Sequence, residues 1–143
     1  MPEFSEAAPD RCVPAAPCQD GLVQIARRDG VTVISMAGEI DLESAPGVER
    51  AVLGAVEASA GRRVVIELSR VRLFGACGVT VLVTAHEEAR RSGGDVVVVL
   101  DDAAPAARTL GCIPEIVLPV FRTVTAAVGA APGQAEFFST SGP

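Results

Sequence analysis

The sequence predicts a single α/β domain built on a mixed sheet, and three observations support this prediction. Short β-prone runs alternate with segments of helical periodicity along most of the 143 residues. An Asp-Gly pair joins the first two β-prone runs, which is the signature of an antiparallel hairpin. Each later β-prone run is separated from the next by a helical segment, which favours parallel strands joined by right-handed crossovers.

The first elements are a hairpin and a helix. Residues 22–27 and 31–37 are the two β-prone runs, with the Asp-Gly turn between them. Apolar residues recur at a helical period over residues 44–59. Ser44 is suited to cap this helix, and Pro46 falls in its first turn, where a missing N–H is tolerated.

Strand and helix alternate over the rest of the chain. Strands are expected over residues 63–68, 95–100 and 116–118, and helices over residues 79–91, 105–110 and 123–130. The run DVVVVL at residues 95–100 is typical of a strand that is covered on both faces. The complete order is therefore β-β-α-β-α-β-α-β-α.

The two ends of the chain differ in composition from its middle. Residues 1–19 carry four prolines and three acidic residues, which predicts a disordered N-terminal arm, and residues 132–143 predict a flexible C-terminal tail. The folded domain is expected over residues 20–131. The arm has neither the basic start nor the apolar block of a signal peptide, and no apolar run is long enough to cross a bilayer. We therefore expect a cytoplasmic protein that does not enter a membrane.

The charge balance and the cysteine spacing argue against several functions. A chain with a net charge of −6 lacks the basic face that nucleic-acid binding needs. The cysteines form no C-x-x-C pair and the chain has one His, so no metal site is expected. No phosphate-binding loop motif is present, and no cofactor is expected. The cysteines are Cys12, Cys18, Cys77 and Cys112.

The segment GACG at residues 75–78, which we term the elbow, stands where a β-prone run turns into a helix. Its small side chains allow another molecule to approach the backbone closely. The first N–H groups of a helix are unpaired and carry a partial positive charge, which favours a carboxylate or phosphate of a partner. We therefore expect a contact surface at the elbow. Leu73 and Phe74, directly before it, are expected to lie in the core and anchor it.

Three segments resemble the signatures of STAS domains. GEIDLESAP at residues 38–46 resembles G-E-[LI]-D-x-x-x-A-P, and the run through the elbow resembles a strand that ends in a V-x-F-x-D-S-S-G turn before a helix. TLGCIPEIVLPVFRTVTAAVGA at residues 109–130 resembles the closing L-x-x-x-G-L-x-x-x-F-x-x-F-x-x-x-x-x-A. By pattern, the chain is most similar to the bacterial anti-sigma factor antagonists. The resemblance implies the STAS fold, in which a mixed central sheet of four to five strands has about four helices packed mainly on one face.

The resemblance implies a binding module rather than an enzyme. Members of the family bind an anti-sigma factor of the kinase type through the turn before the second helix and nearby loops, and binding frees a sigma factor. The kinase phosphorylates the first Ser of D-S-S-G, and the added charge breaks the complex. We expect a monomer or weak dimer. The residues expected to contact the partner are Glu39, Asp41, Leu42, Ser44, Gly75, Ala76, Cys77, Gly78, Thr80, Asp101 and Asp102.

The elbow departs from the family pattern at the phosphorylated position. Aligned on its last glycine, it puts Gly75 at the Asp, Ala76 at the phosphorylated Ser and Cys77 at the second Ser. Ala76 has no hydroxyl, so the usual switch is not expected to operate there. Thr80 and Ser69 are the nearest hydroxyls, and neither is favoured as a replacement. We therefore expect constitutive binding or control by another input.

Three alternatives to this function stay open. Cys77 at a helix N-terminus favours a thiolate, so Cys77 alone or paired with Cys112 would make a redox-sensing module. The simpler interpretation makes Cys77 a small substitute for Ser and Cys112 an apolar plug. A chain without the phosphosite would also serve as a scaffold. A thiol enzyme is not expected, because the elbow fits neither G-x-[SC]-x-G nor C-x5-R, and His86 is nine residues from Cys77.

The acidic residues near the elbow each have two interpretations. Glu39 and Asp41 are close enough in sequence for an acid–base pair, but we favour a place beside the partner site. Asp41 or Ser44 as a helix cap is the purely structural interpretation. Asp101 and Asp102 end a strand that should be parallel to the one before the elbow, and they either cap the third helix or face a basic partner.

Overall fold

The computed structural model describes residues 23–101, 103–111 and 118–130 of the chain. The expected arm and tail, and most of the expected strand at residues 116–118, lie outside these residues. Four individual residues named above lie outside as well, namely Cys12, Cys18, Asp102 and Cys112. In the described part, no helix combines the length and the apolar composition that crossing a bilayer requires.

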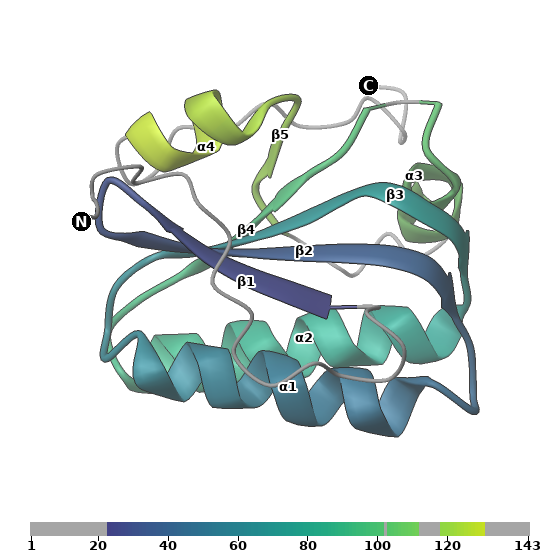
Figure 1. Ribbon diagram of the computed structural model, residues 1–143, viewed down its shortest axis with the longest axis horizontal. Coiled ribbons are helices and arrows are strands. Elements are labelled where there is room, and N and C mark those ends of the chain that lie inside the picture. Colours follow the sequence, from purple (N-terminus) through teal and green to yellow (C-terminus); the bar gives the residue numbers. More distant parts are fainter. Residues whose placement is uncertain (1–22, 102, 112–117, 131–143) are drawn as a thin grey trace.

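The sheet has five strands in the order β1-β2-β3-β4-β5, so strands that are neighbours in sequence are neighbours in space (Figure 1). The first pair is antiparallel and the other pairs are parallel, which confirms the predicted mixed sheet. The strands are β1 (Val23–Arg28), β2 (Val31–Ile40), β3 (Val64–Phe74), β4 (Val96–Val99) and β5 (Val120–Phe121).

The turn between β1 and β2 is the tight hairpin that the Asp-Gly pair predicts. Asp29 and Gly30 both have a positive φ, 53° and 81°, as a type I′ turn requires at its two central residues. The twist of such a turn matches the twist of the strands that it joins. The pairing therefore runs without a shift along the whole of β1.

Helices cover the two faces of the sheet unequally. α1 (Ala45–Ala58) and α2 (Ala76–Arg91) lie side by side across one face, whereas α4 (Val124–Gly129) lies on the other (Figure 1). The short α3 (Pro105–Gly111) packs against β3, and its alanines join the same core as α1 and α2. This arrangement confirms that the helices pack mainly on one face.

The hydrophobic core is divided between the two faces. The larger cluster lies between the sheet and the helices α1 and α2, and Ile34, Ile66 and Leu82 are fully buried in it. The smaller cluster lies between the sheet and α4 and includes Val65 and Phe121. The four valines of β4 alternate between the two clusters and are all buried. The DVVVVL run is therefore covered on both faces, as predicted.

Several element bounds differ from those expected, and β2 runs to Ile40 instead of ending at residue 37. β3 continues past residue 68 because it pairs with the long β2 as far as Phe74, whereas β4 stops opposite Glu67. β4 does not cover this extension, which exposes charged residues such as Arg72. Because of these charges, the extension lacks the apolar pattern by which a strand is predicted from sequence. α2 begins at Ala76, three residues before its expected start. β5 begins two residues beyond the end of the strand expected there.

An arginine fixes the structure at the edge of the sheet opposite the elbow. The Arg63 guanidinium donates two hydrogen bonds to the Asp95 carboxylate, at 3.1 and 2.9 Å, in a bidentate ion pair. Its third nitrogen donates to the backbone carbonyls of Ala127 and Ala130, at 2.9 and 2.8 Å, where α4 ends. This contact, which we term the Arg63 clasp, joins the starts of β3 and β4 to the end of α4.

Candidate partner-binding surface

The elbow turns β3 into α2 along a path that its glycines shape. Gly75 is the N-cap residue with an extended backbone, and its N–H donates to the carbonyl of Ile40 at 3.1 Å. This bond ties the elbow to the end of β2. Gly78 lies against the ring of Phe74, and a Cβ added to Gly78 would lie 2.7 Å from the ring carbon Cε1. A side chain at residue 78 would therefore force the buried ring of Phe74 to move.

The other elbow side chains are small and reach the surface. Ala76 is exposed, and Cys77 is a half-buried free thiol whose Sγ lies 3.9 Å from the carbonyl oxygen of Ile40. Thr80 is exposed one turn into α2, and its hydroxyl donates to the carbonyl of Ala76 at 3.4 Å. Ser69 is exposed on β3, before the elbow. A partner would therefore reach the elbow backbone without displacing a large side chain.

The loop between β2 and α1 is held by hydrogen bonds among its own polar groups. Asp41 Oδ1 accepts from the N–H groups of Glu43 and Ser44, at 3.1 and 3.0 Å. The Ser44 hydroxyl donates to the carbonyl of Glu39 at 2.9 Å, and its oxygen accepts from the N–H of Asp41 at 3.0 Å. Ser44 is the N-cap residue of α1, but its hydroxyl turns back into the loop instead of bonding to a helix N–H. The cap expected of its side chain is therefore absent, whereas Pro46 lies in the first turn as expected.

The same hydrogen bonds fix the charge of Asp41. The N–H of Ser44 is the main group that holds the pKa of the Asp41 carboxyl below its ordinary value, and the Ser44 hydroxyl and the N–H of Glu43 act in the same direction. The carboxylate is therefore ionised at neutral pH and is engaged in holding the loop. This engagement favours a structural role for Asp41 over the acid–base role that its spacing from Glu39 left open.

Two large apolar side chains are exposed beside the elbow. Leu42, in the loop between β2 and α1, is 84% exposed, and Leu73, in β3, is 49% exposed. The expectation that Leu73 lies in the core is wrong, because neighbouring strand residues point to opposite faces and the buried one is Phe74. Leu73 pairs in register with Glu39, so the two segments lie side by side. We term Leu42, Leu73 and the elbow together the elbow surface.

Asp101 follows a strand that ends before the elbow is reached. β4 ends at Val99, which pairs with Glu67 of β3. β3 continues for seven more residues to Phe74, so β4 stops well before the elbow. The Asp101 carboxylate accepts a hydrogen bond from the N–H of Ala103 at 2.9 Å. Ala103 precedes α3, which begins at Pro105, so this bond forms a turn before the helix and does not cap it. Both interpretations of Asp101 stay predictions.

Sequence reasoning missed a contact between α3 and the elbow. The Thr109 hydroxyl donates to the backbone carbonyl of Phe74 at 2.7 Å, directly before the elbow begins. The contact joins residues 35 apart in the chain and fixes the last residue of β3. This hydrogen bond could not be predicted from a lone threonine in a short helix, because the sequence pattern does not indicate which strand end the helix will contact.

The described part of the chain brings no catalytic partner to the Cys77 thiol. His86 follows it by nine residues on α2, a rise of about 13 Å along the helix axis. The imidazole is half-buried, its Nδ1 has no hydrogen-bond partner in the described structure, and burial lowers its pKa, with Arg90 adding to the effect. The described residues also contain no cluster of His, Cys, Asp and Glu that could hold a metal ion. A pairing of Cys77 with Cys112 stays a prediction.

Comparison with known proteins finds a matching family model and named relatives. A family model described as STAS domain matches residues 23–127. The chain is 39% identical to the anti-sigma-F factor antagonist RsfB of Mycobacterium tuberculosis over 70 residues, which are 49% of this chain and 57% of RsfB. It is 34% identical to the anti-sigma-F factor antagonist RsfA of the same organism over 107 residues, which are 74% of this chain and 84% of RsfA. The chain thus spans just over half the length of RsfB and most of RsfA.

A solved structure agrees with these sequence relatives. The crystal structure of an anti-sigma factor antagonist from Mycobacterium paratuberculosis is similar with a TM-score of 0.63 and 31% identity. The match covers 74% of this chain and 89% of that one. The same fold is therefore present in a protein that shares almost a third of the aligned residues.

Proposed function

The chain belongs to the STAS domain family, and on that premise we propose that it is an anti-sigma factor antagonist, which binds an anti-sigma factor of the kinase type and so frees a sigma factor. Relatives that are named for this activity support the proposal. In this chain, the observation that carries it is the elbow surface. Small side chains and two exposed leucines stand there at the start of a sixteen-residue helix.

The physical chemistry of the elbow surface suits a protein partner. Burying Leu42 or Leu73 against apolar groups would contribute about 1.5–3 kcal/mol for each side chain that becomes fully covered. The first N–H groups of α2 would receive a carboxylate of the partner. The hydrogen bonds around Asp41 hold the neighbouring loop in place, so little conformational freedom is lost on binding.

We propose further that this surface is not switched by phosphorylation at the family position. Ala76 occupies that position, is exposed and has no hydroxyl. A phosphate there would bring a charge of about −1.5 to −2 into the contact. Without it, the chain would bind its partner constitutively, or under a control that acts elsewhere.

The test is binding to candidate anti-sigma factors from the same cell by titration calorimetry, with a charge placed at the elbow. Ala76→Glu should weaken binding by about tenfold or more, because it leaves a carboxylate in a desolvated contact. Ser92→Glu, at the exposed far end of the same helix, is the matched control and should bind like the unmodified chain. Equal affinity for all three proteins would move the interface away from the elbow. Transfer of phosphate from ATP to Thr80 or Ser69 would contradict the absence of a switch.

A redox-sensing module is the alternative that a specific observation favours. Cys77 is a free, half-buried thiol at the N-terminus of α2, inside the elbow surface. Oxidation of Cys77 would then change binding at the elbow surface. Cys77→Ser should bind in the same way with and without oxidant, whereas the unmodified chain should lose affinity when oxidised. An unmodified chain that is insensitive to oxidant would leave the thiol as a small packing residue.

A further inference from the structure

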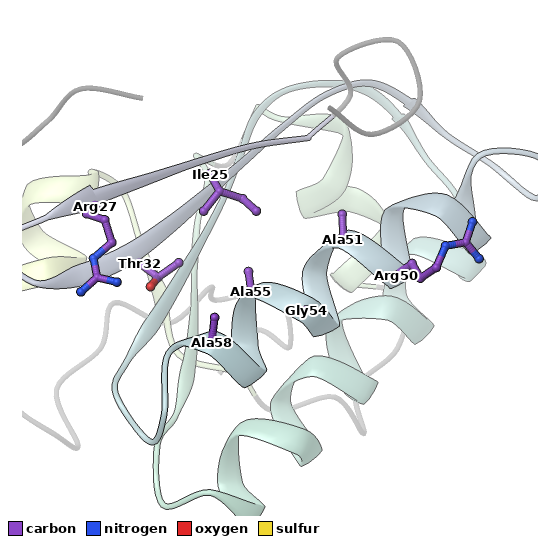
Figure 2. A pocket seen from close by; sticks show the side chains of 8 residues that line it. All are labelled: Ile25, Arg27, Thr32, Arg50, Ala51, Gly54, Ala55 and Ala58. Atoms are coloured by element: carbon purple, nitrogen blue, oxygen red, sulfur yellow. The ribbon is translucent and has the colours of Figure 1, made fainter. Parts of the chain in front are cut away.

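A groove runs between the edge strand β1 and the helix α1, away from the elbow (Figure 2). Its volume is about 320 Å³. Figure 2 shows side chains of β1 and β2 on one side of the gap and side chains of α1 on the other. The residues that line it are Ile25, Arg27, Thr32, Arg50, Ala51, Gly54, Ala55 and Ala58. None of them belongs to the elbow surface.

The groove exists because α1 presents small side chains to β1. Ala51, Ala55 and Ala58 follow one another at helical spacing, and no larger residue fills the space between them and the strand. Ile25 is therefore only half-buried. The one hydroxyl in the lining, on Thr32, already accepts a hydrogen bond from the Ser59 hydroxyl at 2.9 Å. The groove thus offers an apolar surface to whatever occupies it.

Positive charge stands at both ends of this apolar surface. Arg27, on β1, and Arg50, on α1, stand at opposite ends of the lining, and both side chains are exposed (Figure 2). Neither forms an ion pair with another residue of the described ranges. In addition, β1 is the end strand of the sheet and pairs with β2 alone among the described strands, so its outer edge can accept a further extended segment. An extended, partly apolar and acidic peptide fits these features.

We propose that the groove is occupied by the chain's own N-terminal segment, residues 1–22. This segment runs directly into Val23, the first residue of the strand that lines the groove. It carries four acidic residues against one arginine, and it includes Phe4 and Val13 as apolar groups. The proposal replaces the disordered arm that composition alone predicts, and it does not rest on the proposed function.

Length and tethering favour this occupant over a separate molecule. The lining stretch of α1 from Arg50 to Ala58 is about 12 Å long. Twenty-two extended residues reach about 70 Å, so the segment can turn back from Val23 and cover the groove with residues to spare. A tethered segment also competes at an effective concentration on the order of millimolar, which a free peptide rarely matches in a cell.

The natural thiols of the segment, Cys12 and Cys18, allow a direct test in the full chain. Ala58→Cys places a thiol in the groove at an exposed position. Under mild oxidant it should form an intrachain disulfide with Cys12 or Cys18, identified by peptide mapping. Glu87→Cys, exposed on α2 and outside the groove, is the matched control. The groove variant should cross-link about tenfold faster than the control, because docking raises the effective concentration of the two thiols.

A second measurement tests the charges. Reversing both Arg27 and Arg50 to Glu in the Ala58→Cys chain should slow the same disulfide toward the rate of the Glu87→Cys control. Three results would overturn the proposal. They are equal cross-linking rates at the two positions, a rate unaffected by the charge reversal, and disulfides that form between chains at a rate that rises with protein concentration. The last would assign the groove to the segment of a second copy.

Discussion

The edge of the sheet where the parallel strands begin differs from the edge where they end in the groups that it exposes. At the edge where β3 and β4 begin, the Arg63 clasp pairs a charged side chain with Asp95 and with two carbonyls of α4. At the edge where β2 and β3 end, the elbow surface exposes two leucines, a methyl group and a thiol. The first edge is closed by polar bonds within the chain, and the second keeps apolar groups available. We infer that the first edge serves stability and the second serves recognition.

The largest effect should come from breaking the closed edge. Arg63→Ala removes the ion pair and leaves Asp95 and two carbonyls without their donor, which should lower the free energy of unfolding by about 2–3 kcal/mol. Urea denaturation followed by circular dichroism measures this. Arg72→Ala, which changes an exposed arginine in β3, is the control and should change stability by less than about 0.5 kcal/mol. Similar decreases in the free energy of unfolding for both variants would show that the Arg63 clasp does not stabilise the fold.

The packing of the elbow gives the next largest effect. Gly78→Ala puts a Cβ 2.7 Å from the ring of Phe74, and this overpacking should lower the free energy of unfolding by about 1–3 kcal/mol. Gly54→Ala in α1, where a Cβ meets nothing within 4 Å, should raise it by about 0.5–1 kcal/mol because alanine favours helix. Thermal unfolding of both variants checks the opposite signs. A stabilising Gly78→Ala would show that the ring moves aside freely.

A substitution in the elbow surface should change the affinity for the partner but not the free energy of unfolding. Leu42→Ser changes a side chain that is 84% exposed, so the free energy of unfolding should change by less than about 0.5 kcal/mol. If the elbow surface is the interface, affinity for the anti-sigma factor should fall by about tenfold, because a central apolar contact is lost. Calorimetry of unfolding and of binding on the same sample separates the two quantities. A stability loss as large as that of Arg63→Ala would contradict the division between the edges.

The smallest expected effect is on the pH dependence of stability, and it comes from His86 on α2, between the two edges. Burial lowers the pKa of His86 from its ordinary 6.5, so the unfolded chain takes up a proton that the folded chain resists. Stability from this residue is therefore complete above pH 6.5 and declines as the pH falls through 6.5 toward the lowered folded pKa. Unfolding measured across this range should show a shallower decline in His86→Gln. An unchanged profile would assign the pH dependence to other groups.

The amino-acid pattern predicts the fold better than it predicts the surface. The Asp29-Gly30 hairpin, the buried β4 valines and the alternation of strand and helix all follow from local rules, because turn chemistry and apolar period act over a few residues. The far half of β3 escaped prediction because its partner is β2, and pairing partners are not visible in a local pattern. The expectation that Leu73 lies in the core is wrong for a related reason. Which of two neighbouring apolar residues points inward depends on the register of the strand.

The candidate site shows the same division. The small residues of the elbow and their place at the start of a helix could be predicted, because glycine and the strand-to-helix change mark the turn in the sequence. The hydrogen bond from Thr109 to Phe74 could not, because it joins residues 35 apart. The end of β4 opposite Glu67 could not be predicted either, because the chain gives no sign of where that strand stops.

The exposed methyl group of Ala76 has a consequence for how such proteins diversify. Replacing it with serine would place a hydroxyl at the surface and would require no rearrangement of the core around Phe74 or Gly78. Under the proposed function, one exchange at this position would therefore add or remove a phosphorylation site while the fold beneath it stays as it is.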